Sequence, residues 1–95
     1  MFYRLNRVKH EAGKRDSLVA YLKSQESTLS SIKGLQSVTI VGVSETESMG
    51  LAAYESEDHF NVAQEKIQEM MAGMMPLMTA PPDTDTGNVI WSFKK

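Results

Sequence analysis

Hydrophobic and polar residues alternate along this chain in two periods, one typical of β-strands and one typical of α-helices. Residues 2–9 alternate with the period of two that a strand requires. Apolar residues recur at spacings of three and four over residues 17–32 and again over 56–74, which predicts two amphipathic helices. Three further strands are predicted, at residues 35–44, 49–55 and 88–93.

The order of these elements is strand, helix, strand, followed by strand, helix, strand. This order is typical of a ferredoxin-like α+β fold, in which an antiparallel sheet carries both helices on one face. At 95 residues, the chain is long enough for a single domain, which we place at residues 1–95.

Residues with special backbone or capping properties mark the ends of the predicted elements. Gly13 lies in the turn after the first strand, and Gly34 follows the first helix, where a left-handed conformation can end it. Ser56 is the expected N-cap of the second helix. Residues 80–87, which contain two consecutive prolines, are predicted to be a loop.

The strand at residues 35–44 is apolar at consecutive positions, which is typical of a strand covered on both faces. Two helices on one face of a four-stranded sheet leave the other face bare. A bare apolar face is a liability on a monomer. We therefore expect a homodimer in which two sheets pack face to face around a two-fold axis.

Charge and cysteine content remove several classes of partner and chemistry. Ten Lys and Arg residues stand against twelve Asp and Glu, for a net charge of −2, so we expect no nucleic acid or anionic membrane as a partner. The absence of cysteine excludes disulfides and thiolate metal sites. No stretch has the roughly 20 apolar residues that span a bilayer, and the N-terminus does not read as a signal peptide. We expect a cytoplasmic protein.

Four short segments carry a resemblance to a known family. They are Asn6-Arg7-Val8-Lys9, the turn ending in Gly13-Lys14, Gly34-Leu35 after the first helix, and Ser56-Glu57-Asp58-His59-Phe60 at the start of the second helix. Together they resemble the dimeric α+β barrel superfamily, in particular its antibiotic-biosynthesis-monooxygenase-like branch. The resemblance implies a ferredoxin-like fold, a homodimer whose two sheets form a barrel, and a cavity between helices and sheet.

The same resemblance bears on the cofactor. The superfamily includes cofactor-free oxygenases of polycyclic aromatics and haem-degrading oxygenases. Haem-degrading members carry an Asn on the first strand, which Asn6 matches, and a Trp and an axial His on the second helix. With Phe60 as the anchor, the Trp position falls near Ala63 and the His position near Gly73, and neither residue is kept. We expect no cofactor.

Two residues are candidates for catalysis. Asn6 could orient a ligand or an oxygen species inside the cavity, or it could be a strand Asn that bonds to backbone near an edge. His59 could act as a general base near the cavity mouth, or it could be a solvent-exposed His at a helix start. His10 is expected to lie exposed in a turn. The two His residues have no clustered carboxylates beside them, so no metal site is predicted.

Two further sets of residues are candidates for binding. Met70, Met71, Met74, Met75 and Met78 could line an adaptable apolar pocket or simply fill the core. The predicted ligand pocket consists of Arg4, Phe60, Asn61, Met71 and Met74. The predicted dimer interface consists of Trp91, Val41 and Tyr3, although Trp91 could instead stack on a flat ligand.

Two functions from different classes remain. The first is an oxidoreductase: a cofactor-free oxygenase that acts on a small hydrophobic or aromatic molecule in the helix–sheet cavity. The second is a non-catalytic dimer that binds a small ligand or only assembles. RNA binding by the open sheet is disfavoured because residues 49–54 lack an aromatic and basic pattern.

Overall fold

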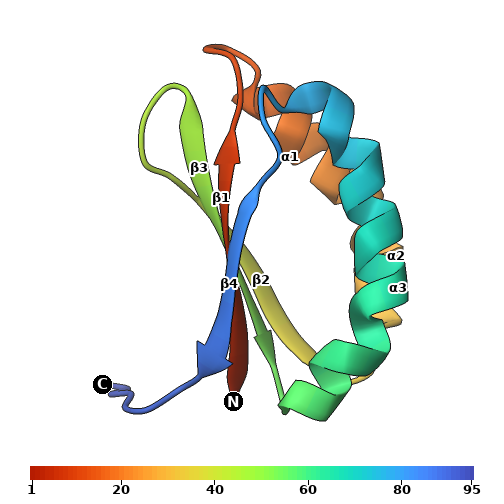
Figure 1. Ribbon diagram of the computed structural model, residues 1–95, viewed down its shortest axis with the longest axis vertical. Helices are drawn as coiled ribbons and strands as arrows, with labels where there is room; N and C mark the ends of the chain where they lie inside the picture. Colours follow the sequence, from red (N-terminus) through yellow and green to blue (C-terminus); the bar gives the residue numbers. More distant parts are fainter.

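The computed structural model describes residues 1–95 and contains a four-stranded antiparallel sheet of strand order β2-β3-β1-β4 (Figure 1). The elements in chain order are β1 (Phe2–Lys9), α1 (Arg15–Ser24), α2 (Glu26–Ser30), β2 (Leu35–Gly42), β3 (Glu47–Tyr54), α3 (Glu57–Met74), the short 3₁₀ helix η1 (Met75–Leu77) and β4 (Asp83–Asn88). The predicted ferredoxin-like α+β arrangement is confirmed.

All the helices lie on the same side of the sheet, and its other face is uncovered (Figure 1). The core lies between these two layers. Its main cluster consists of Phe2, Ile32, Ala52, Tyr54, Ala63, Ile67 and Met70. A second cluster, nearer the carboxyl end of α3, consists of Val8, Leu18 and Met74. Burial of this apolar surface is what holds α3 against the sheet.

The N-terminus of α3 has the predicted cap. The Ser56 hydroxyl accepts a hydrogen bond from the backbone N–H of His59 at 3.3 Å, and Glu57 and Asp58 occupy the first turn. The Ser56 oxygen accepts from a backbone N–H group that has no partner within the helix. The two carboxylates lie at the positive end of the helix dipole, where negative charge is favourable.

The helix predicted at residues 17–32 is not continuous. It is divided into α1 and α2 at Gln25, whose backbone angles (φ −101°, ψ 4°) depart from helical values. The neighbouring Ser24 hydroxyl donates a hydrogen bond to the backbone oxygen of Tyr21. A serine side chain can in this way compete with the backbone hydrogen bonds of a helix, and the break at Gln25 comes directly after the Ser24 bond.

The last strand lies earlier than predicted, and residues 80–87 are not all loop. β4 covers Asp83–Asn88, whereas residues 89–95 form no regular structure. The register explains the difference, because Asn88 pairs with Phe2, the first residue of β1. Beyond Asn88, β1 offers no further strand residue for pairing, however high the β-propensity of the segment that follows.

Within one chain, β2 is covered on one face only. Val38 and Ile40 are half-buried on the helix side, while Val41 on the outer face is exposed. The strand is also shorter than predicted, because the backbone N–H groups of Val43 and Ser44 both donate to the Glu47 oxygen and close the hairpin there. The expected cover of the outer face would have to come from another chain.

Candidate functional site

The strand register places four side chains of β1 on the face of the sheet that the helices cover. Phe2, Arg4, Asn6 and Val8 are all buried there, as the alternation of residues 2–9 predicts. Their partners on β3 are Tyr54, Ala52, Gly50 and Ser48 in the same order. Because Ala52 and Gly50 are small, the sheet has little bulk opposite Arg4 and Asn6, and space remains between sheet and helices.

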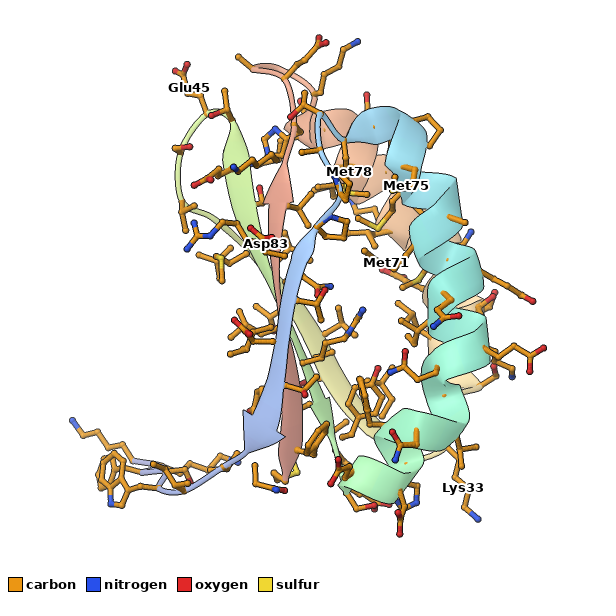
Figure 2. The ribbon with its side chains drawn as sticks, in the orientation of Figure 1. Lys33, Glu45, Met71, Met75, Met78 and Asp83 are labelled. Atoms are coloured by element: carbon orange, nitrogen blue, oxygen red, sulfur yellow. The ribbon has the colours of Figure 1, made fainter.

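A small cavity of about 30 Å³ occupies that space. α3 contributes Met70, Met71 and Met74 to its wall, and Figure 2 shows Met71 on the side of α3 that faces the sheet. The sheet contributes Arg4, Asn6, Val8, Val38, Ile40, Gly50, Leu51 and Ala52, and α1 contributes Leu22. The volume is close to one water molecule's share of the liquid, so a larger ligand requires the flexible methionines to move.

A larger groove of about 730 Å³ runs along the edge strand β2, between it and the helices α1 and α2. Its apolar lining residues are Val19, Leu22, Leu29, Leu35, Val38 and Ile40. Three of these, Leu22, Val38 and Ile40, also line the inner cavity. The groove has the volume of a small-molecule site, and these three side chains border both spaces.

Asn6 is a buried polar group at the centre of this site, with 5% of its surface exposed. Its side-chain oxygen accepts a hydrogen bond of 2.8 Å from the Thr84 hydroxyl on β4, and its NH₂ group has no hydrogen-bond partner in the protein. The partner is a side chain and not the backbone that the alternative interpretation of Asn6 invoked. The bond to Thr84 holds the amide with donors available to the cavity.

Arg4 also lines the cavity, and its guanidinium makes no hydrogen bond or ion pair within the protein. Tyr54 is fully buried beside it and its hydroxyl has no partner either. Burial lowers the pKa of Arg4 and raises the pKa of Tyr54, and the mutual influence of the two groups opposes both shifts in part. They are thus near neighbours without a well-formed hydrogen bond. Sequence reasoning placed Arg4 in the pocket and missed Tyr54.

His59 lies in the first turn of α3 and does not line the cavity. Its ring shares a hydrogen bond of 2.7 Å with the Ser56 hydroxyl and lies 3.4 Å from a Glu55 carboxylate oxygen. Its ring also packs against Gly34. These contacts give His59 a structural role at the junction of β3, α3 and the end of α2, away from the site around Asn6.

Phe60 and Asn61 follow His59 but lie in different surroundings. Phe60 packs on the rings of Phe2 and Tyr54, with centroid distances of 5.1 and 5.3 Å, and closes one end of the core. Asn61 is exposed, so the structure places it outside the predicted pocket. The two residues are one position apart on a helix, and only one of them can face the sheet.

The expectation that His10 is exposed is wrong. His10 is 1% exposed, and its Nε2 atom lies 2.9 Å from the hydroxyl of the equally buried Ser48. Arg15 donates from Nε to the same hydroxyl at 3.2 Å and from Nη2 to the backbone oxygens of Ser44 and Glu47. The β1–α1 turn folds onto the β2–β3 hairpin here, a contact between distant segments that local sequence does not reveal.

The three residues predicted at the dimer interface lie on or beyond the outer face of the sheet. Tyr3 and Val41 point away from the helices, Tyr3 half-buried and Val41 exposed. Trp91 lies in the segment after β4 and is 79% exposed. That segment extends away from the helices (Figure 1).

Two further properties concern metals and membranes. No group of three or more His, Asp or Glu side chains is close enough together to hold a metal ion. No helix combines the length and apolar character needed to cross a membrane.

No family model matches the sequence, and no curated protein matches it significantly. Solved structures do resemble it. A monooxygenase from the gene ActVA-Orf6 of Streptomyces coelicolor, in complex with nanaomycin D, superposes with a TM-score of 0.84 at 17% identity, over 99% of this chain and 91% of that one. A variant of SnoaB, a cofactor-independent oxygenase from Streptomyces nogalater, gives a TM-score of 0.79 at 11% identity, over 99% and 97%.

A third structure of the same shape is a variant of MhuD with two manganese protoporphyrin IX molecules per active site. Its TM-score is 0.80 at 13% identity, over 100% of both chains. At such low identities the likeness establishes the fold. The chain therefore has the fold of the antibiotic-biosynthesis-monooxygenase-like proteins, as the sequence resemblance predicted.

The residues present do not fit a haem held by an axial His on the second long helix. Gly73 occupies that position, and the Tyr21 hydroxyl lies directly against it, so that even a Cβ atom there would collide with the ring of Tyr21. The same hydroxyl donates a hydrogen bond of 2.7 Å to the Met70 backbone oxygen. The space that an axial imidazole would need is thus filled by a tyrosine bonded to the helix.

Proposed function

We propose that this protein is a homodimeric oxygenase that uses neither a metal nor an organic cofactor and oxidises a small aromatic or enolisable molecule. The substrate would lie in the groove beside β2, with its reactive carbon in the inner cavity. The observation that carries the proposal is the buried Asn6 amide, held by Thr84, with free N–H donors in a cavity whose other side chains, apart from Arg4, are methionine and aliphatic.

The chemistry follows from this environment. An enolate or phenolate is electron-rich enough to react with dioxygen, and N–H donors fixed in a water-poor site stabilise the developing negative charge. Conversion of a substrate methylene to a carbonyl consumes one O₂, places one oxygen atom on carbon and releases the other as water with the two hydrogens removed. The substrate supplies all four electrons, so no further reductant is needed.

The likeness to solved structures supports this proposal at the level of the fold. A cofactor-independent oxygenase and a monooxygenase with a bound ligand both share the arrangement of sheet and helices. Positioning and electrostatics, the two contributions that a site without strong acids, bases or metals can offer, are the ones that Asn6 and the apolar wall would provide.

The homodimer is part of the same proposal. The outer face of the sheet carries the apolar side chains Tyr3, Leu5, Val41, Met49 and Leu51. The segment after β4 adds Ile90, Trp91 and Phe93, which are 99%, 79% and 73% exposed. A second copy packed on this face would cover both sets, since exposed apolar surface of this extent is uncommon on monomers.

Oxygen consumption tests the proposal. The protein would be mixed in air-saturated buffer with a panel of fused-ring phenols and enolisable ketones, and O₂ uptake and product would be followed. We expect turnover of at least one compound, reduced about 100-fold or more in Asn6→Ala because a donor to the developing anion is lost. Asn61→Ala is the matched control, because Asn61 is exposed, and it should keep the activity.

A second function remains if uptake is absent. The inner cavity is small and holds no nucleophile paired with a base, which suits a protein that binds a ligand without converting it. Binding of a panel compound without O₂ uptake in the parent protein would contradict the oxygenase proposal and favour this second function. Equal activities of Asn6→Ala and Asn61→Ala would contradict the role given to Asn6.

A further inference from the structure

Besides the NH₂ group of Asn6, three buried side-chain groups in the helix–sheet layer have no hydrogen-bond partner: Arg4 Nε, the Tyr54 hydroxyl and Gln64 Nε2. All three can donate a hydrogen bond, and Arg4 carries a positive charge. Arg4 and Tyr54 come from adjacent strands and are each more than nine-tenths buried. Gln64 lies on α3 one turn after Phe60, whose ring packs on Tyr54.

Leaving such groups unpaired is costly, because water has been removed and nothing replaces its hydrogen bonds. The cost is greatest for Arg4, since a buried cation is ordinarily matched by a carboxylate. The ion pair of this protein that involves an arginine joins Arg7 to Glu47, and Arg4 takes no part in one. The folding of the chain alone gives no reason to keep this cation on the inner face of the sheet.

We propose that Arg4, the one of these groups that lines the cavity, binds one anionic oxygen group of the ligand, a carboxylate or an ionised phenol or enol, with the hydroxyl of the neighbouring Tyr54 as a second donor. The ligand's apolar body would occupy the groove beside β2. This inference rests on the proposed function only in placing the ligand in the same cavity, and it adds the chemical class of that ligand.

The arrangement of groove and cavity supports this orientation. Leu22, Val38 and Ile40 line both spaces, so that a flat apolar molecule lying along them extends from the open groove to the wall that contains Arg4. The groove also contains a second cation, Lys23, together with Glu26, but both are exposed to water. A desolvated guanidinium attracts an anion far more strongly than an ammonium group in water does.

The electrostatics of Arg4 and Tyr54 reflect the burial of both groups. Burial disfavours the charged form of each group and so lowers the pKa of Arg4 and raises the pKa of Tyr54. A bound carboxylate or phenolate would accept from the guanidinium and from the neutral hydroxyl together, and so satisfy both donors.

Binding of matched probes tests the inference. 2-Naphthoate, 2-naphthol and the uncharged 2-naphthamide would be titrated into the purified dimer or monomer, whichever the protein forms, by calorimetry at pH 7 and at pH 10. If the anion is a carboxylate, naphthoate binds at both pH values about tenfold or more tightly than the amide. If it is a phenolate, naphthol gains affinity at pH 10, where it ionises.

Variants locate the site. Arg4→Met should weaken binding of the preferred anion about tenfold or more, and Tyr54→Phe should weaken it severalfold. Lys23→Met, which removes the exposed cation of the groove, should change it little. The melting temperature of unliganded Arg4→Met should equal or exceed that of the parent, because a buried charge without a partner has been removed.

Three results would overturn the inference: no binding of any anionic probe by the parent, equal affinity for the anion and the amide, or full affinity in Arg4→Met. If the probes bind according to their charge but no O₂ is consumed, this inference holds and the oxygenase proposal fails. If Arg4→Met consumes O₂ as fast as the parent protein does, the oxygenase proposal holds and this inference fails.

Discussion

At the scale of single residues, some buried polar groups of this protein have hydrogen-bond partners and others do not. His10, Ser48 and Arg15 are joined to one another and to backbone oxygens, which makes them a structural link. Arg4 and Tyr54 lie on the same inner face and have no partners. Since most buried polar groups in proteins are paired, the unpaired ones are the better markers of a site.

Replacement of Ser48 by Ala tests the structural link. The change leaves His10 Nε2 and Arg15 Nε without their shared partner in a buried place. We expect the free energy of unfolding to fall by about 1–3 kcal/mol, measured by chemical denaturation. Ser44→Ala in the neighbouring exposed loop is the control and should cost no more than about 0.5 kcal/mol. Equal losses in the two variants would contradict a special role for Ser48.

At the scale of elements, turns and caps determine where helices and strands end. Gly13 and Gly34 both adopt left-handed backbone angles, with φ of 81° and 85°. The backbone oxygen of Gly34 also accepts a hydrogen bond of 2.8 Å from the backbone N–H of Glu55, and the His59 ring packs against the Cα atom of Gly34. The two glycines thus share a conformation and differ in surroundings.

This pair allows steric contact to be measured separately from backbone strain. Gly13→Ala should cost about 1 kcal/mol of unfolding free energy, since the new Cβ meets no atom within 4 Å and only the strain remains. Gly34→Ala should cost about 1–3 kcal/mol more, because its Cβ would collide with the His59 ring. Denaturation curves give both values, and the further change His59→Ala should recover part of the difference. Equal costs at the two positions would refute the contact.

At the scale of the whole molecule, the sheet has one face in the core and one in solvent (Figure 1). The helices bury the inner face, and the outer face together with residues 89–93 exposes aromatic and aliphatic side chains. Because the hydrophobic effect favours burial of exposed apolar surface, the proposed homodimer would bury the sheet face that a single chain leaves exposed.

The substitution Trp91→Glu tests the assembly. A charge in a buried interface is costly, so we expect the dimer to dissociate to chains of 10.6 kDa, as measured by light scattering or native mass spectrometry. Val62→Glu is the matched control, since Val62 is 84% exposed on α3, on the opposite side of the molecule from the bare sheet face, and should leave the mass unchanged. A dimer that survives Trp91→Glu would exclude Trp91 from the interface.

Much of the fold follows from local sequence. The alternation of residues 2–9 identifies the side chains of β1 that share a face, and the pattern of residues 56–74 identifies α3 with Ser56 as its cap. Gly34 has the predicted left-handed conformation, but the helical segment before it ends earlier than expected, at Ser30. Each of these features depends on interactions between residues a few positions apart, and such interactions can be read from spacing and residue type.

The site can be predicted only in part from local sequence. Arg4, Asn6, Met71 and Met74 can be assigned to the cavity because they occupy inward positions of predicted elements. Asn61 and His59 cannot be excluded by the same reasoning, because their exposure depends on the rotation of α3 against the sheet. Whether a carboxylate lies close enough to pair with Arg4 depends on all the elements that pack around it.

The sequence by itself therefore determined the order of strands and helices, the Ser56 cap and which side chains of β1 share a face, all of which arise from short-range patterns. Only the tertiary structure decided that β4 is the polar segment Asp83–Asn88, because β1 begins at Phe2 and a single backbone hydrogen bond, from the Val89 N–H to the Met1 oxygen, follows the pair of Phe2 and Asn88. It also decided that His10 is buried and bonded to Ser48 and that Arg4 and Tyr54 are left without partners. These facts depend on contacts between residues far apart in the chain, where spacing carries no information.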